Sequence, residues 1–184
     1  LKKKPKNPVF AGKIILITGA GSGIGKACTE MFAENGGVVS ALDINPSIKG
    51  LFGRKEILEI VCDATDKNQI QQAIAETIRK FGGIDIVISN AGIFSANSTI
   101  EDMNDETWNK SIDVNLTGHM QLLKNCIPFL KEGIEPAIVI IGSKNVPAPG
   151  PGAGAYSAAK AGLSQLARVA ALELGKYGIR VNVV

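Results

Sequence analysis

Residues 14–25 read Ile-Ile-Leu-Ile-Thr-Gly-Ala-Gly-Ser-Gly-Ile-Gly, and this stretch decides the fold class. The apolar run 14–17 is continuous, as a strand buried on both faces of a parallel sheet requires. The glycines after it allow a tight turn, let backbone N–H groups approach a pyrophosphate, and let a helix start close to the strand. Glycines also serve in ordinary turns, but a helix N-terminus at this point favours an anion. The residues expected to contact a nucleotide here are Gly19, Gly21, Ser22, Gly23, Ile24 and Gly25.

The alternation of strand and helix continues along the chain. Between the predicted strands, apolar residues recur at helical spacing, in 24–32, 70–78, 108–120 and 163–174. This repetition favours right-handed crossovers and a doubly wound parallel sheet, an α/β fold in one domain. Short, mostly β-branched apolar runs predict strands at 14–17, 38–42, 57–62, 84–88, 137–141 and 179–184.

The composition narrows the class of protein. The 184 residues are 45% hydrophobic and 20% charged, which is ordinary for one soluble globular domain. A net charge of +3 is small, so no nucleic-acid partner is expected. No apolar run approaches the roughly 20 residues that a membrane helix needs. Cys28, Cys62 and Cys126 are widely spaced, which favours reduced thiols in a cytoplasmic protein and no metal site.

Acidic residues follow the second and third predicted strands. Asp43 comes about 20 residues after the Gly-rich turn, where a carboxylate can accept hydrogen bonds from the adenosine ribose. The carboxylate would repel a 2′-phosphate, so Asp43 favours NAD over NADP, unless it is a plain turn residue. Asp63, with Ala64 beside it, can meet the adenine edge. The alternative for Asp63 is a cap on the helix that starts near Asp66.

A second group of residues points to acid–base chemistry. Tyr156 and Lys160 are four apart, on one face of a predicted helix. A nearby ammonium favours the phenolate, so Tyr156 can act as base in oxidation and as acid in reduction. Ser143 follows the fifth predicted strand, where its hydroxyl can hydrogen-bond a substrate oxygen. A Tyr–Lys pair also occurs by chance on many helix faces; the combination with Ser143 and the Gly-rich turn favours a catalytic site.

The motifs, taken in order, resemble the short-chain dehydrogenase/reductase family. The resemblance extends from Lys13 to Val184 and implies a Rossmann fold with strand order 3-2-1-4-5-6. It implies that Lys160 also holds the nicotinamide ribose, and that Asn115 anchors a water in a proton relay behind Lys160. The motifs that carry it are Thr18–Gly25, Asn90-Ala91-Gly92, Asn115, Ser143 and Tyr156-Ser157-Ala158-Ala159-Lys160, with Asn90, Ala91 and Gly92 expected beside the cofactor.

The chain departs from the family pattern at several positions. Ser89 stands where the family often has a second Asn, and we expect it to change a local hydrogen bond. Residues 179–184 look like a sixth strand, so the seventh strand and the substrate lid are expected to be absent from a dehydrogenase domain at 9–184. Trp108 is predicted to be core, His119 a helix-surface or packing residue, and Lys144 to face substrate or solvent.

Residues 142–152 are similar to the dehydrogenase half of bifunctional proteins that carry a class II aldolase domain before it. The linker-like segment 1–8 suits such a fusion. This resemblance implies carbohydrate metabolism, with a small aldehyde, alcohol or sugar-derived substrate, and the family implies a homo-oligomer.

The sequence therefore predicts an NAD-dependent oxidoreductase acting on CH–OH groups, and it leaves alternatives open. A 3-oxoacyl or keto-sugar reductase would prefer NADPH, which Asp43 disfavours. A non-catalytic NAD-binding module would have no use for Asn115, Ser143, Tyr156 and Lys160. A flavin or S-adenosylmethionine protein could share the Gly-rich turn but would leave Tyr156 and Lys160 unexplained.

Overall fold

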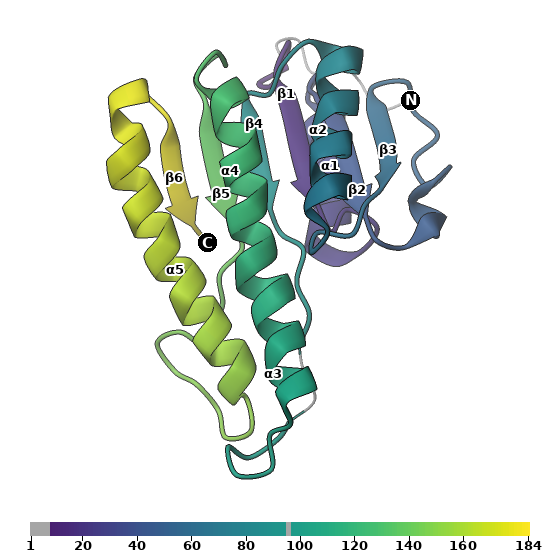
Figure 1. The fold of residues 1–184 in the computed structure, drawn as a ribbon. Helices are drawn as coiled ribbons and strands as arrows, with labels where there is room; N and C mark the ends of the chain where they lie inside the picture. The colour runs from purple at the N-terminus through teal and green to yellow at the C-terminus, as the bar shows by residue number, and fades with distance from the viewer. Residues whose placement is uncertain (1–7, 95–96) are drawn as a thin grey trace.

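The structure is a computed structural model that describes residues 8–94 and 97–184, so most of the expected linker 1–8 lies outside the described residues. The strands are β1 (Ile14–Thr18), β2 (Val38–Asp43), β3 (Ile57–Val61), β4 (Ile86–Ser89), β5 (Ala137–Ile140) and β6 (Arg180–Val183). They form one parallel sheet in the order β3-β2-β1-β4-β5-β6 (Figure 1). This order, which the family resemblance implied, is confirmed. No strand extends beyond its predicted run by more than one residue.

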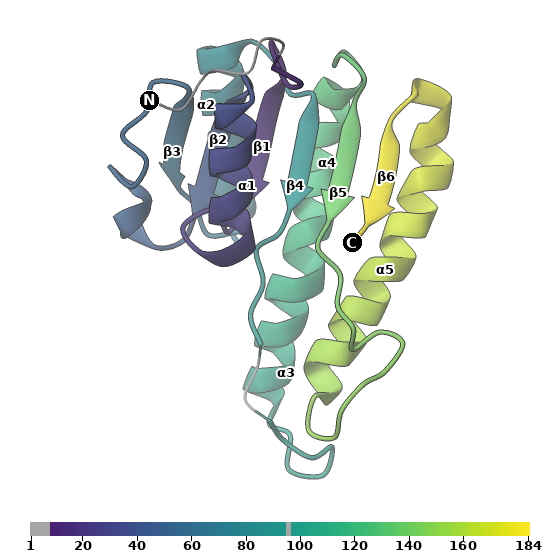
Figure 2. The same ribbon diagram turned by 180° about the vertical axis from the view of Figure 1, so that it is seen from behind.

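Helices cover both faces of the sheet. They are α1 (Gly23–Glu34), α2 (Lys67–Phe81), α3 (Asp105–Ile112), α4 (Gly118–Leu130) and α5 (Gly154–Leu174). Figure 1 shows α2, α4 and α5 on one face, and Figure 2 shows α1 on the other, so the sheet is doubly wound as predicted. α3 and the start of α5 reach past the carboxyl ends of the strands (Figure 1). None of the helices in the described ranges has the length and apolar character of a membrane span.

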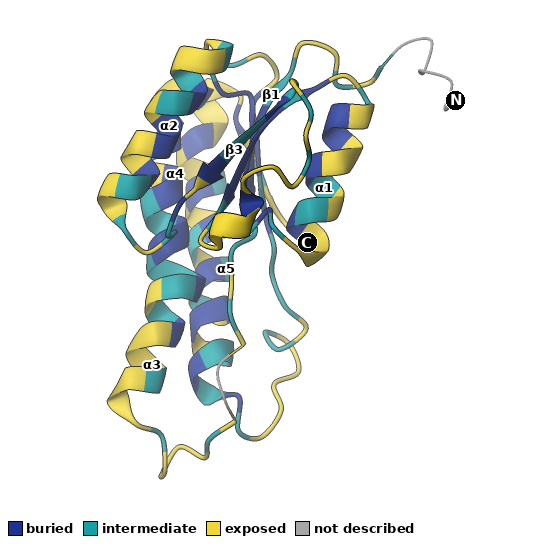
Figure 3. Ribbon diagram, turned by 90° about the vertical axis from the view of Figure 1, so that its right-hand side faces the viewer, coloured by how far each residue is buried: buried dark blue, intermediate teal, exposed yellow. Residues whose placement is uncertain are grey.

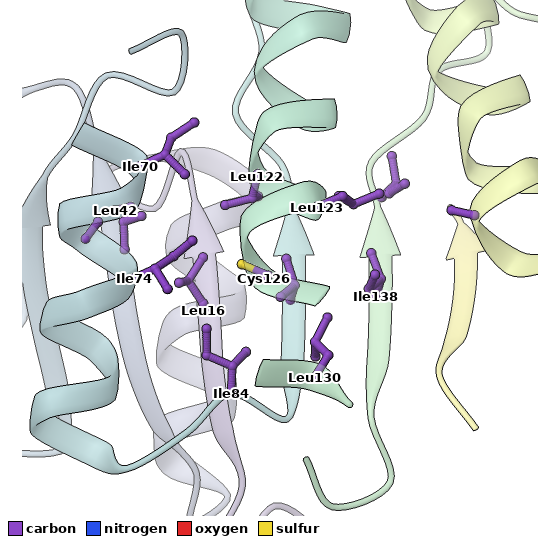
Figure 4. Close-up of a cluster of buried hydrophobic side chains, with 14 of the residues drawn as sticks. Leu16, Leu42, Ile70, Ile74, Ile84, Leu122, Leu123, Cys126, Leu130 and Ile138 are labelled. Carbon is purple, nitrogen blue, oxygen red and sulfur yellow. The ribbon is translucent and has the colours of Figure 1, made fainter. Parts of the chain in front are cut away.

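The hydrophobic core has two parts, one on each face. Successive strand residues point to opposite faces, so Leu16 packs toward α2 and α4, while Ile15 and Ile17 pack toward α1. Figure 4 shows the first part, in which Leu16 and Ile74 lie close to Ile84 and Cys126. Because β1 is buried on both faces, every position of its apolar run had to be apolar.

The sheet-facing side of α1 differs from the predicted apolar stripe. Ile24 and Met31 are exposed, and the buried residues include Gly25, Thr29 and Phe32. A Cβ on Gly25 would lie 2.1 Å from the carbonyl oxygen of Gly19, so the helix starts in backbone contact with the turn. This close approach selects small residues at the start of the inner face and turns Ile24 outward.

One other prediction needs correction, and one pair of alternatives is decided. Trp108 is 41% exposed and is not core, because α3 lies beyond the edge of the sheet, where Figure 3 shows mostly exposed residues. His119 is the packing residue, not the surface residue, of the two alternatives predicted: only 3% of it is exposed, and it packs against the end of β4. The spacing of apolar residues shows which face of a helix a residue occupies, but it does not show how far that face lies from the sheet.

The cysteines are free thiols, as predicted. Cys62 and Cys126 are buried and Cys28 is partly buried. Burial raises the pKa of the Cys62 thiol to about 12, so this thiol is protonated at neutral pH. Its chemistry is therefore that of a small apolar side chain.

A buried carboxylate fastens the amino-terminal edge of the sheet. Asp85, which is 5% exposed, accepts the N–H of Ile14 at 2.8 Å and the N–H of Ile134 at 2.6 Å. It thereby joins the start of β1 to the loop between α4 and β5. Lys13 and Glu135 form an ion pair of 2.8 Å across the same junction, with the Glu135 side chain 80% exposed.

Candidate active site

A cavity of about 890 Å³ opens at the carboxyl ends of the strands. Ligands of open α/β sheets bind at this edge. The predicted cofactor residues on its wall are Gly19, Ser22, Gly23, Ile24, Asp43, Asp63, Ala64, Asn90, Ala91 and Gly92. Residues of the Gly-rich turn and residues at the strand ends, which the sequence predicted to contact the cofactor, therefore line one cavity.

The Gly-rich turn shapes the floor of the cavity. Gly19 and Gly23 have φ angles of 65° and 49°, in the left-handed region that favours glycine. Gly21 and Gly25 do not line the cavity; a Cβ on Gly21 would lie 2.8 Å from Asp43 Oδ2. Ser22 caps α1 without a side-chain hydrogen bond, so N–H groups of the first helical turn remain available to an anion.

Asp43 connects the second strand to this turn. Its Oδ2 accepts the N–H of Gly21 at 2.7 Å, and its Oδ1 accepts the N–H of Asn45 at 2.9 Å. An ionised carboxylate offers about four acceptor positions, so room remains for ribose hydroxyls. The next residue, Ile44, lines the same cavity and is 64% exposed, so no cation stands beside Asp43 in sequence.

Asp63 lies on the cavity wall but does not cap a helix. Its Oδ1 accepts hydrogen bonds from the backbone N–H and the hydroxyl of Thr65, at 2.8 and 2.7 Å. The N-cap of α2 is Asp66, whose carboxylate accepts the N–H groups of Asn68 and Gln69. The helix-cap alternative for Asp63 was therefore wrong, and its contact with adenine stays a prediction.

Asn90 fastens the end of β4 to the end of β1. Its Nδ2 donates to the carbonyl oxygens of Thr18 and Gly19 at 2.9 and 3.1 Å. In return, Thr18 Oγ1 accepts the N–H groups of Asn90 and Ala91, both at 3.1 Å. The amide therefore shapes the cavity by holding its backbone.

Asn115 lies in a π-helical turn, Asp113–Thr117, between α3 and α4. Such turns are rare and occur often at functional sites. Asn115 is fully buried and grips Ile93: Oδ1 accepts its N–H at 3.0 Å, and Nδ2 donates to its carbonyl at 2.9 Å. Nδ2 also donates to Ser111 Oγ at 3.2 Å. Both amide protons are thus used, so a relay water would have to bind another atom.

Lys160 meets Asn115 beside Gly92. A Cβ on Gly92 would lie 3.0 Å from Asn115 Oδ1 and 3.8 Å from Lys160 Nζ. The ammonium donates to the carbonyl oxygen of Ile141 at 2.8 Å, which leaves two of its three protons for other partners. Burial lowers the pKa of Lys160 to about 8.

Tyr156 begins the same helix face one turn earlier and contacts Phe94. The two ring centroids lie 4.9 Å apart with the planes tilted by 53°, and Phe94 is 61% exposed. The sequence reasoning missed Phe94, because it lies in a loop where no periodicity marks it. The nearest signal was its place two residues after Gly92.

Ser143 lines a second cavity, of about 670 Å³. It follows β5, which ends at Ile140, and its Oγ accepts the N–H of Asn145 at 3.1 Å. Lys144 is exposed and lines the same cavity. Ile24 lines both cavities, so the two meet at the start of α1.

Not all the predicted catalytic residues touch in this structure. Asn115 and Lys160 lie together, whereas Ser143 and Tyr156 share no hydrogen bond among those seen in the described residues. Those residues also contain no group of three or more His, Cys, Asp or Glu side chains that could hold a metal ion.

Comparison with known proteins identifies the family. The family model described as short chain dehydrogenase matches residues 13–184. The chain belongs to this family. It is therefore an oxidoreductase with a site for a nicotinamide dinucleotide, as the sequence predicted at this level.

Individual relatives differ in length and in what their names state. The chain is 35% identical over 181 residues to 3-oxoacyl-[acyl-carrier-protein] reductase FabG of Thermotoga maritima, covering 94% of this chain and 72% of FabG. It is 34% identical over 189 residues to the uncharacterized oxidoreductase YuxG of Bacillus subtilis, covering 98% of this chain but 27% of YuxG.

Solved structures share the fold over almost the whole chain. The 3-ketoacyl-(acyl-carrier-protein) reductase of Brucella melitensis, complexed with NADH, matches with a TM-score of 0.91 and 29% identity. The match covers 94% of this chain and 74% of that one. An NAD⁺-bound xylitol dehydrogenase matches with a TM-score of 0.90 and 30% identity, over 95% and 70% of the two chains.

Proposed function

We propose that the protein transfers a hydride between NAD and a small alcohol or carbonyl substrate. The observation that carries the choice of NAD is the Asp43 carboxylate on the cavity wall, followed by the apolar Ile44. A 2′-phosphate at this point would meet a negative charge without a neighbouring cation in sequence. The first cavity suits the adenosine half of a dinucleotide on the Asp43 side, and the nicotinamide would lie beyond its edge at Gly92, towards Lys160.

The residues present fit this cofactor. The free N-terminus of α1 suits the pyrophosphate, and Lys160 has two protons left to donate to the nicotinamide ribose. Bound nicotinamide would supply the hydride acceptor or donor. Tyr156 takes the hydroxyl proton in oxidation and returns it in reduction. Lys160 lies one helical turn from Tyr156 on the same face of α5, and Ser143 would donate a hydrogen bond to the substrate oxygen.

Asn115 supports this chemistry by holding backbone. Its two bonds to Ile93 fix the segment that presents Phe94 to the Tyr156 ring. A relay water behind Lys160 would use Asn115 Oδ1 or a backbone carbonyl of the π-helical turn, since both Nδ2 protons are donated.

The finer assignments belong to the same proposal. The substrate is a small aldehyde, alcohol or sugar-derived compound in carbohydrate metabolism, and the domain, residues 9–184, forms a cytoplasmic homo-oligomer. Fusion to a preceding aldolase domain rests on the resemblance of residues 142–152, and YuxG, of which this chain covers 27%, is a longer relative. A 3-oxoacyl reductase is the second candidate, favoured by the similarity to FabG.

Paired fluorescence titrations with NADH and NADPH test the proposal. We expect NADH to bind at least about tenfold more tightly than NADPH, a difference of about 1.4 kcal/mol. Asp43→Ala should remove this preference. Tyr156→Phe should bind NADH normally and lose turnover across a panel of small alcohols, aldehydes and 3-oxoacyl thioesters. Tight NADPH binding with 3-oxoacyl turnover would establish the second candidate, and near-normal turnover by Tyr156→Phe would remove the assigned base.

A further inference from the structure

His119 is a buried histidine that the proposed chemistry does not use. It lies on α4, and its Nδ1 is 2.6 Å from Oγ of Ser89, the last residue of β4. Burial, reinforced by the positive charge of Lys160, lowers the pKa of His119 to about 3, so the ring is neutral at physiological pH. The pair is one uncharged hydrogen bond between a helix and a strand end.

The other ring nitrogen lacks a hydrogen bond of good geometry, and a small void adjoins the ring. Among residues 8–94 and 97–184, none reaches His119 Nε2 within normal limits, although the backbone of Ala91 lies close enough to the ring to oppose part of the fall in its pKa. A buried polar atom without a well-formed hydrogen bond costs stability. The void measures about 10 Å³, close to the least that a water molecule needs. Thr18 also lines it. Its Oγ1 already accepts two N–H groups, so its own proton is left to donate.

The void lies directly behind the wall of the cofactor cavity. The residues that line both are Thr18, Ala64, Ala91 and Val114. Ser89 directly precedes Asn90, whose amide holds the Gly-rich turn. A shift of the His119 side chain would therefore move the cavity wall at two places, the end of β1 and the end of β4.

We propose that His119 is a positioning residue for the cofactor cavity, and that one water in the void joins its Nε2 to the Thr18 hydroxyl. The water would complete a chain of hydrogen bonds from Thr18 on β1, through His119 on α4, to Ser89 on β4. It serves either tautomer of the neutral ring, because water both donates and accepts. The inference rests on the proposed cofactor site.

His119→Phe tests the role, since it keeps a planar ring and removes both nitrogens. We expect the Kd for NADH to rise about fivefold or more, as for a lost buried hydrogen bond. Ser89→Ala should raise the Kd for NADH by a similar factor. The double variant should bind NADH no more weakly than either single variant, because both changes break the same hydrogen bond. His119→Gln, which keeps polar atoms, should recover part of the affinity. If His119→Phe does not fold, Ser89→Ala still tests the same chain.

Thr77→Val is the matched control. Thr77 Oγ1 accepts from Ser40 Oγ at 2.8 Å, since its own proton goes to the Ala73 carbonyl; this is another buried bond between a helix and a strand, and neither residue lines the cavity. This variant should lower the melting temperature without changing the Kd for NADH. The same pattern in both His119→Phe and Ser89→Ala would overturn the positioning role.

A crystal structure at about 1.5 Å resolution tests the water, since a water held by two or more polar partners gives clear density. An empty void would overturn that part of the proposal. If the wild type binds neither NADH nor NADPH, the proposed function itself fails; if it binds NADH and the variants bind equally well, only the role of His119 fails.

Discussion

Lys160 differs from a surface lysine in its surroundings. The residue is 3% exposed, and its ammonium donates to the Ile141 carbonyl, beside Gly92 and Asn115. Burial disfavours the charged form and lowers its pKa from the ordinary 10.5 to about 8. The residue that holds the ribose in our proposal therefore loses its charge close to physiological pH.

The affinity for NADH should depend on pH through this group. Below about pH 8 Lys160 is charged, and as the pH rises through that value the ammonium is lost and the Kd for NADH should increase. The measurement is a fluorescence titration from pH 6.5 to about pH 9.5. Lys160→Arg is the control, because a guanidinium stays charged over this range and its Kd should be flat. A flat profile for the wild type would contradict the assignment.

The same shift affects stability with a definite sign. Between about pH 8 and pH 10.5 the unfolded chain holds more protons at Lys160 than the folded chain does. The contribution of this group to the free energy of unfolding therefore rises with pH in that window and is constant below it.

Among the elements, α1 and the helix formed by α3 and α4 shape the site most directly. α1 starts in backbone contact with the turn, so its dipole ends at the cavity. The π-helical turn between α3 and α4 places Asn115 opposite Ile93. In both elements, the path of the backbone determines which groups lie at the site.

Gly25→Ala should separate α1 from the turn. Its Cβ would lie 2.1 Å from the Gly19 carbonyl oxygen and 2.7 Å from Asn90 Nδ2, and the first of these is backbone that cannot swing aside. We expect a loss of about 2–4 kcal/mol of stability, as for overpacking, and loss of NADH binding. Chemical unfolding and nucleotide fluorescence measure the two effects.

Gly175→Ala provides the comparison. Gly175 has φ −54° and open space around its Cβ position, so its substitution should leave stability and NADH binding unchanged or slightly improved. Equal behaviour of the two alanine variants would show that the contact at Gly25 does not constrain the turn.

In the whole molecule, the site and the structural fastening occupy opposite edges of one sheet. Both cavities open at the carboxyl ends of the strands, the edge at which open α/β sheets bind their ligands. At the amino ends, Asp85 ties β1 to the loop before β5. Changes at that edge should affect folding without affecting the chemistry.

Asp85→Ala should cost about 3–5 kcal/mol, because it removes the charged acceptor of two backbone hydrogen bonds, from Ile14 and Ile134. Urea unfolding measures the loss, and the Kd for NADH of the folded fraction should not change. Glu135→Gln is the control across the same junction: the Glu135 side chain is 80% exposed and an amide oxygen can still accept from Lys13, so the free energy of unfolding should fall by less than about 1 kcal/mol. A small effect of Asp85→Ala would mean that water replaces the carboxylate.

The sequence by itself determined the strands, the Gly-rich turn and the acidic strand end. These depend on local requirements: a strand buried on both faces needs a continuous apolar run, and close contact between helix and strand needs glycine. The strand order came only through the resemblance to a family, since periodicity says nothing of which strands are neighbours.

The tertiary structure alone decided the partners of the polar residues. Ser89 and His119 are 30 positions apart, and Asn115 grips a backbone 22 positions away. Phe94, in a loop, contacts Tyr156 on α5, and Trp108 is exposed because its helix extends beyond the sheet. These contacts depend on how far each helix face lies from the sheet and on the order of the strands. The local spacing of apolar residues along the chain determines neither of these.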